Sequence, residues 1–249
     1  MMHLPPNKVS FYCFVFGATL VQYNLHYLVK TEAVKDSARL SWSLKNKNVH
    51  VILVAIGVIL IIYSLFSFRI RHYVILLVMG MIALIYSFPV LPGRKRIKDF
   101  GLLKILTLAL LWTLVTVWFP VVNLSFYNGL FWFIFFKRFI FMFVLCLLFD
   151  MRDAEIDRAH HIHTIAVRVG LRNSYYISYF TLGLFAILCL VQFYFFGDAP
   201  VLFATLISAV ATFITIEFTK TIRSDFIYLA GIDGMMLLQA SLIYLAIKF

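Results

Sequence analysis

The stretch DMRDAEID, at residues 150–157, ends one of the most apolar runs of the chain. It holds four of the eleven acidic residues of a protein whose formal net charge is +11. If the helix that enters this stretch continues through it, Asp150, Asp153 and Asp157 lie at positions i, i+3 and i+7 and share one face. Three carboxylates so close together repel one another, so we expect cations to hold them. The candidates are Mg²⁺ bound with a phosphorylated ligand, and the arginines interleaved with the stretch.

The composition of the chain is that of a membrane protein. Of its 249 residues, 63% are hydrophobic and 18% aromatic, and the mean hydropathy is +0.95. These values lie far outside the usage of soluble globular proteins and predict an all-α, polytopic transmembrane bundle. Residues 1–249 are expected to form a single membrane domain. About eight spans are predicted, at residues 9–28, 49–68, 73–91, 101–119, 128–149, 174–196, 200–218 and 226–247.

The placement of Lys and Arg predicts the orientation of these spans. Basic residues gather in the connections after the first, third, fifth and seventh spans and are scarce on the opposite side. Because cytoplasmic loops collect Lys and Arg, we expect residues 150–157 to face the cytoplasm and both termini to lie outside the cytoplasmic, or inner, membrane. The positive charge is then explained by orientation and by anionic headgroups, and nothing in the chain indicates nucleic-acid binding.

A cationic segment is predicted on the same face as the acidic stretch. The third span closes with Tyr86 and two prolines, and the sequence RKRIK follows at residues 94–98. The prolines stop the helix. Read alone, the segment is a positive anchor, but because it shares a face with the aspartates, Arg94, Arg96 and Lys98 are suited to binding a phosphate or diphosphate.

Other polar residues interrupt the apolar spans. Asn24 and His26 end the first span, where they form either an interfacial belt or the border of the same cavity as the aspartates. Asp233 lies about two turns into the last span, where an aspartate is costly unless it is paired or faces water. Lys137 and Arg138 lie too far from Asp150 to pair with it, and we expect them to snorkel or to pair inside the bundle.

Three segments resemble the UbiA superfamily of intramembrane prenyltransferases. The pattern Asp-x-x-Asp-x-x-x-Asp at residues 150–157, followed by TIAVRVG at 164–170, is similar to the second aspartate motif of the family. The stretch from Tyr86 to Lys98 is similar to the Tyr-Ser and Lys-Arg segment that closes an earlier helix, and residues 231–234 fit an aspartate of a late helix. The resemblance covers residues 10–249 and implies a helical bundle around a central cavity, with Mg²⁺ as cofactor and a prenyl diphosphate as substrate.

The sequence departs from the family pattern in its first aspartate motif. Asn24 is the one anchor of that motif, and Leu25, Leu28 and Glu32 stand where its three aspartates belong. Members usually have nine helices, and one N-terminal helix is expected to be missing here. His161 also replaces the glycine that usually follows the second motif.

Two functions therefore remain open. The first is Mg²⁺-dependent transfer of a polyprenyl group from a prenyl diphosphate to a lipophilic or aromatic acceptor. The second is a catalytically inactive relative that acts as a structural or lipid-binding subunit, with a membrane-protein partner or as a homo-oligomer. Proton-coupled transport is a third reading, and no inverted repeat supports it. For the enzyme, Asp150, Asp153 and Asp157 are the expected catalytic and metal-binding residues, Arg94, Arg96, Lys98 and Arg152 bind the diphosphate, and Asn24, His26, Glu32, Tyr86 and Asp233 line the cavity.

Overall fold

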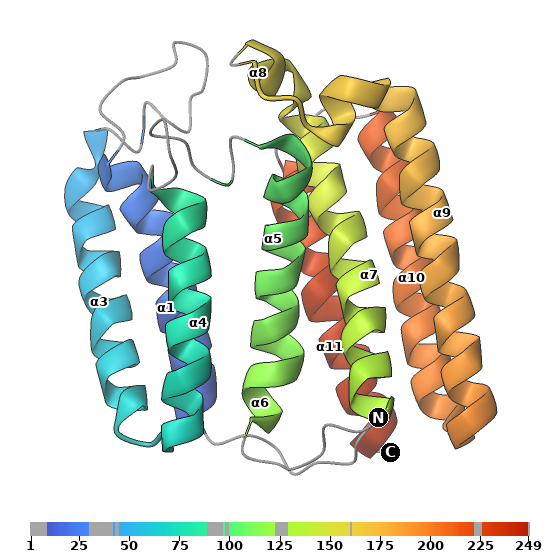
Figure 1. Ribbon diagram of the computed structural model, residues 1–249, viewed down its shortest axis with the longest axis horizontal. Coiled ribbons are helices and arrows are strands. Elements are labelled where there is room, and N and C mark those ends of the chain that lie inside the picture. Colours follow the sequence, from blue (N-terminus) through green and yellow to red (C-terminus); the bar gives the residue numbers. More distant parts are fainter. Residues whose placement is uncertain are drawn as a thin grey trace. The chain divides into compact units, whose positions relative to one another are not determined.

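The structure is a computed structural model that describes residues 9–29, 42, 45–88, 97, 100–122, 129–159, 161–221 and 226–248. Every regular element in these ranges is helical, which confirms the predicted all-α class (Figure 1). The chain divides into two compact units, residues 4–74 and residues 75–249. The two units are described one at a time, and the single membrane domain expected from the sequence stays a prediction.

Within the described residues, seven helical segments are long and apolar enough to cross a membrane, which indicates an integral membrane protein. They match the second to eighth predicted spans. The first helix, α1 (Val9–Val29), is apolar over the shorter segment Val9–Leu25. The seven segments are Lys47–Leu65, Ile70–Ser87, Gly101–Val121, Gly129–Arg152, Ile165–Phe196, Ala199–Thr221 and Ala230–Lys248.

In the N-terminal unit, α1 packs closely against α3 (Lys47–Leu65). The closest approach is between two glycines: a Cβ atom added to Gly17 would lie 2.7 Å from the carbonyl oxygen of Gly57. Small residues allow such close backbone contact between helices in a membrane. Nearer the end of α1, Oδ1 of the buried Asn24 accepts a hydrogen bond of 2.7 Å from His50 Nδ1, and Asn24 Nδ2 donates another to Leu20 O. Asn24 thus joins the two helices.

In the C-terminal unit, α7 (Gly129–Arg152) is the central helix (Figure 1). It packs against α5 (Gly101–Thr113) and against α9 (Ile165–Phe196), and α9 packs against α10 (Ala199–Thr221), which in turn packs against α11 (Asp233–Lys248). Large side chains of α7, among them Phe131, Phe141 and Leu147, are fully buried. A helix that is apolar on all sides is expected at the core of a membrane bundle.

Shorter elements complete this unit. A π-helix, η2 (Leu114–Trp118), and a single helical turn, α6 (Phe119–Val121), continue α5. A second π-helix, η3 (Ile227–Ile232), leads into α11. α8 (Ala154–Ala159) follows α7. α4 (Ile70–Ser87), which precedes α5 in the sequence, contributes residues to both units, because the boundary between them falls between residues 74 and 75.

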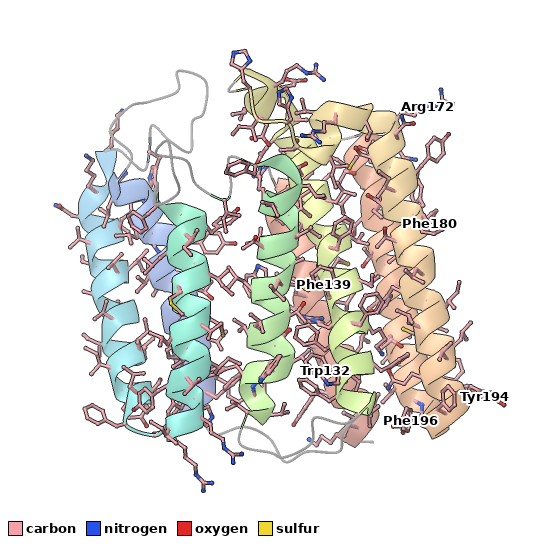
Figure 2. All side chains as sticks on the ribbon, in the orientation of Figure 1. Trp132, Phe139, Arg172, Phe180, Tyr194 and Phe196 are labelled. Carbon is pink, nitrogen blue, oxygen red and sulfur yellow. The ribbon has the colours of Figure 1, made fainter. Side chains whose placement is uncertain are left out.

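Aromatic side chains project from the outer surface of the C-terminal unit (Figure 2). On α9, Phe180 is 77% exposed and Tyr194 is 83% exposed. Large apolar groups on this scale are unfavourable against water but are expected against hydrocarbon, so these side chains mark a lipid-facing surface.

A polar layer crosses the C-terminal unit far from the acidic stretch. Lys137, about 12 Å from the start of α7, is 3% exposed, and its Nζ donates to Gln192 Oε1 of α9. Arg138 donates to Gln239 Oε1 of α11 and, over 3.2 Å, to Thr116 Oγ1 of η2. The expected alternative of pairing inside the bundle is therefore the one observed, and the partners are neutral amides and a hydroxyl.

Candidate functional site

The acidic stretch contains a break that the continuous-helix prediction misses. α7 ends at Arg152, Asp153 forms a turn, and α8 begins at Ala154. The Asp153 amide still donates to Phe149 O, at 3.1 Å, and the Asp157 amide donates to Asp153 O, at 2.8 Å. The chain keeps a nearly helical course, so Asp150 and Asp157 face the same neighbour, while Asp153 turns aside.

That neighbour is Lys104, in the first turns of α5. Its Nζ lies 2.6 Å from Asp157 Oδ2, as a hydrogen-bonded ion pair, and 3.2 Å from Asp150 Oδ1. The sequence pattern counts Lys104 only among the residues of a positive loop. Among the described residues, the cation between these two carboxylates is an ammonium group from another helix. It is neither Arg152 nor Arg158, the arginines interleaved with the acidic stretch.

Gly101 fixes the position of Lys104. A Cβ atom added to Gly101 would lie 1.7 Å from His163 O and 2.6 Å from Thr164 Cα. The start of α5 therefore rests directly on the backbone between α8 and α9, which only glycine permits. Lys104 follows three residues later and projects from this contact toward Asp150 and Asp157, at the end of the unit where α5 and α9 begin and α7 ends (Figure 1).

Asp150 is the most enclosed of the three aspartates, at 1% exposed. Its Oδ2 accepts a hydrogen bond of 3.4 Å from the Ala166 amide, and the Thr164 side chain also bonds to the carboxylate. Thr164 caps α9, because its Oγ1 accepts from the Val167 amide. Asp150 Oδ1 has no hydrogen bond and relies on the ion pair with Lys104. The Lys104 ammonium, 3.2 Å away, is therefore the group that compensates the charge on this buried oxygen.

Asp153 pairs with its neighbour Arg152. The guanidinium binds both carboxylate oxygens, with Nε 2.7 Å from Oδ1 and Nη2 3.1 Å from Oδ2. The same guanidinium lies over the rings of Phe149 and Tyr228, at 5.1 Å and 5.7 Å from their centroids. Arg152, expected to bind diphosphate, is thus held by a carboxylate and two aromatic faces.

The remaining predicted residues are placed as follows. Tyr86, at the end of α4, is half-buried and lies within electrostatic range of Asp150, Asp153 and Asp157. Asp233 begins α11 after η3 and lies within range of Cys146. Asn24 is engaged with His50 in the other unit. The predicted residues that lie outside the described part of the chain are Arg94, Arg96, Lys98, Glu32 and the side chain of His26.

His161, which the resemblance places at a position where glycine is expected, adopts a left-handed conformation with φ of 56°. This conformation is unfavourable for residues with a Cβ atom. Glycine would adopt this conformation without the steric conflict of a Cβ atom, so the histidine keeps the turn at an energetic cost.

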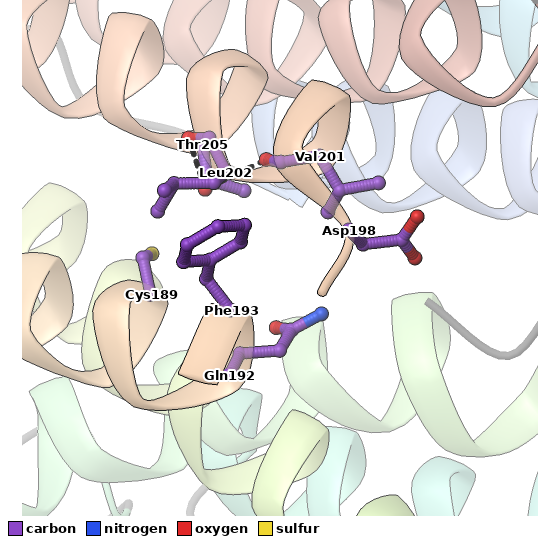
Figure 3. A pocket seen from close by; sticks show the side chains of 7 residues that line it. All are labelled: Cys189, Gln192, Phe193, Asp198, Val201, Leu202 and Thr205. Atoms are coloured by element: carbon purple, nitrogen blue, oxygen red, sulfur yellow. Dashed lines mark hydrogen bonds between the residues drawn. The ribbon is translucent and has the colours of Figure 1, made fainter. Parts of the chain in front are cut away.

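Two hollows lie away from the aspartates. One, at the α9–α10 turn, is lined by Cys189, Gln192 and Asp198, among others, and is packed too closely to hold a water molecule (Figure 3). The other is an apolar groove between α9 and α10 that includes Gly183 and Phe213. Neither contains a residue of the acidic stretch, so the central cavity expected from the resemblance stays a prediction.

The fit of the acidic site to a metal ion rests on Asp150 and Asp157. Within the described residues, no group of three or more His, Cys, Asp or Glu side chains converges on one point. Two carboxylates do converge on a single cation, and one of their oxygens lacks a hydrogen bond. Mg²⁺ is commonly bound by one or two carboxylates together with phosphate oxygens of a substrate. The pair therefore fits Mg²⁺ shared with a phosphorylated ligand, while Asp153 is paired with Arg152 in this structure and its predicted role as a metal ligand stays a prediction.

Fold and site together define an integral-membrane helical protein with a paired-carboxylate site at one end of its bundle. The chain belongs to the UbiA prenyltransferase family, whose sequence profile matches residues 37–226. The match begins after Asn24 and so does not include the degenerate first motif.

Two solved structures share the fold. A UbiA homolog from Aeropyrum pernix K1, in an apo structure, has a TM-score of 0.65 and 13% identity, covering 96% of this chain and 90% of that one. A UbiA homolog from Archaeoglobus fulgidus has a TM-score of 0.63 and 14% identity, covering 98% of this chain and 90% of that one. At these identities the likeness concerns the fold. No curated protein matches the chain.

Proposed function

We propose that the protein is an intramembrane prenyltransferase that binds a prenyl diphosphate next to Asp150 and Asp157 and transfers the prenyl group to a lipophilic or aromatic acceptor. The observation that carries the proposal is the convergence of two buried carboxylates, Asp150 and Asp157, on a single cation. Family membership supports prenyl diphosphate as the substrate class.

In such a transfer, the bond between the allylic carbon and the diphosphate oxygen breaks, and its electron pair leaves with the diphosphate. The acceptor's nucleophilic atom then bonds to the allylic carbon and loses a proton. Mg²⁺ bound with the diphosphate would supply positive charge to the departing oxygens. Asp150 and Asp157 would hold that ion. Asp153 is proposed to act through Arg152, which it orients over Phe149 and Tyr228.

We further propose that Arg94, Arg96 and Lys98 bind the diphosphate from the segment before α5, and that the acidic site faces the cytoplasm with both termini outside the cytoplasmic membrane. Charge supports both statements, because the segment is strongly basic and cytoplasmic loops are rich in Lys and Arg. Tyr86 is proposed to border the site, on the ground of its electrostatic proximity to the three aspartates.

The test is pyrophosphate release by the purified protein with Mg²⁺ and labelled farnesyl or geranylgeranyl diphosphate. Asp150→Asn is expected to abolish release. Glu155→Gln, which removes an exposed acid from the same stretch, is the matched control and is expected to retain it. Absence of release with every chain length and acceptor class would contradict the proposal.

A second candidate is a catalytically inactive family member that serves as a structural or lipid-binding subunit, with a membrane-protein partner or a second copy of the chain. The observation that favours it is internal charge pairing: Lys104 and Arg152 already provide a cation to each aspartate. In that case the protein is expected to co-purify stoichiometrically with a partner or with itself. Replacing all three aspartates with asparagine would leave its phenotype unchanged, and loss of the phenotype would count against this candidate.

A further inference from the structure

Lys104 occupies a position that a metal ion would need. Its ammonium is within 3.2 Å of one oxygen from each of Asp150 and Asp157, and its side chain is 19% exposed. The contact joins α5 to α7 and α8, and it depends on the glycine contact at Gly101. An ion placed between these two carboxylates would have to take the space or the electrostatic role of this nitrogen.

Among the residues that the structure describes, the charges at this point do not balance. Two carboxylates face one ammonium, and the nearer bond, to Asp157, is the only one with hydrogen-bond geometry. Burying one more negative charge than positive charge is unfavourable. Lys104 therefore reduces the repulsion between Asp150 and Asp157 without removing it, whereas a divalent ion would neutralise both carboxylates.

We infer that Lys104 is a built-in counter-cation that competes with a divalent metal ion for Asp150 and Asp157. Without metal, the ammonium keeps the two carboxylates together. When a divalent ion binds, the ammonium is displaced from both oxygens. The side chain has a flexible four-carbon stem and three donors, so it can turn to another acceptor.

The identity of that acceptor rests on the proposed function. The acceptor is a phosphate oxygen of the diphosphate that binds together with the metal. Lys104 would then couple metal binding to substrate binding, because the metal releases the cation that the diphosphate receives. The competition itself depends only on the geometry of Lys104, Asp150 and Asp157.

The inference is tested by Mn²⁺ binding, measured by electron paramagnetic resonance on the purified protein, with Mg²⁺ as competitor. Lys104→Met is expected to bind Mn²⁺ at least about tenfold more tightly than the wild type, since the competing charge is gone. Lys220→Met is the matched control. It removes a lysine that is ion-paired with Glu217 on α10, so the change in net charge is the same and the Mn²⁺ affinity is expected to stay unchanged. Equal or weaker Mn²⁺ binding by Lys104→Met overturns the inference.

Two additional variants keep the test decisive if Lys104→Met folds poorly. Lys104→Arg retains the charge and is expected to keep the low wild-type affinity, so that tight binding by this variant contradicts competition. Asp157→Asn removes a carboxylate from the wild-type site and is expected to abolish Mn²⁺ binding, while unchanged binding would mean that the ion sits elsewhere.

Failure of the proposed function gives a different result. Tighter Mn²⁺ binding by Lys104→Met, with no turnover of any prenyl diphosphate by the wild type, supports the competition and contradicts the transferase. Turnover by the wild type, with no gain of Mn²⁺ affinity in Lys104→Met, supports the transferase and contradicts the competition.

Discussion

Replacing Gly101 with alanine tests the contact that positions the acidic site. The added Cβ atom would lie 1.7 Å from His163 O and 2.3 Å from the His163 carbonyl carbon, and the nearest three atoms all belong to the backbone. No flexible side chain can move out of the way. The start of α5 must separate from the α8–α9 connection by about 1.3 Å to reach even a 3.0 Å contact.

A displacement of this size has two consequences. Overpacking typically costs about 1–3 kcal/mol, and here the rigid neighbours place the expected loss of stability at the upper end of that range. Lys104 moves with α5, so its 3.2 Å contact with Asp150 is expected to exceed the ion-pair range. The same substitution therefore lowers stability and weakens the pairing of the two carboxylates.

Thermal unfolding of the purified protein, followed by intrinsic fluorescence, measures the first effect. Gly80→Ala and Gly129→Ala are matched controls, because a Cβ atom at either position meets no atom within 4 Å. Gly80 is inside α4, where alanine is expected to stabilise the helix by about 0.5–1 kcal/mol. A Gly101→Ala variant as stable as these controls would refute the reasoning about the site.

Three further predictions concern other contacts. Gln192→Leu leaves the buried Lys137 without its acceptor and is expected to cost about 2 kcal/mol, whereas the double variant with Lys137→Met should recover most of that loss in thermal unfolding. Thr164→Val removes the cap of α9 and a bond to Asp150; we expect a loss of about 1 kcal/mol in the same assay, and no change would contradict the capping role. His161→Gly relieves a left-handed residue and is expected to raise the unfolding free energy by up to about 1 kcal/mol, while a decrease would argue against strain there.

The spans were predictable from the sequence because apolar helices are set by local composition. Seven predicted spans match observed helices, with differences mainly at the ends, as for α9, which starts at Ile165 and not near 174. The extra residues, 165–173, include Gly170, whose φ of 80° interrupts the helix and separates its first turn from the apolar span. The charged residues and the glycine in this segment interrupt the apolar pattern, so the pattern did not predict the start of the helix.

The acidic site was predictable in its residues and not in its partners. Asp150 and Asp157 lie together as the i, i+7 spacing predicts, but the turn at Asp153 could not be read from a pattern that suits a continuous helix. Lys104 lies 46 residues before Asp150, in a position that the positive-inside rule already explains. An ion pair between residues far apart in the chain produces no local pattern in a single sequence. Its one local sign is Gly101 in the preceding turn, where an apolar span would otherwise favour a better helix former.

The polar layer around Lys137 and Arg138 constrains how the protein is made. Each charged residue near the centre of a span raises the free energy of membrane insertion by roughly 2.5–3.5 kcal/mol. The phenylalanines and leucines of α7 lower the same free energy and partly offset this cost. The acceptors that relieve this cost, Gln192 and Gln239, are synthesised 55 and 101 residues after their partners. α7 must therefore enter the membrane before the acceptors on α9 and α11 exist, although Thr116, an acceptor for Arg138, has already been synthesised. A chain that stops before Gln239 lacks the partner that α11 provides to its central helix.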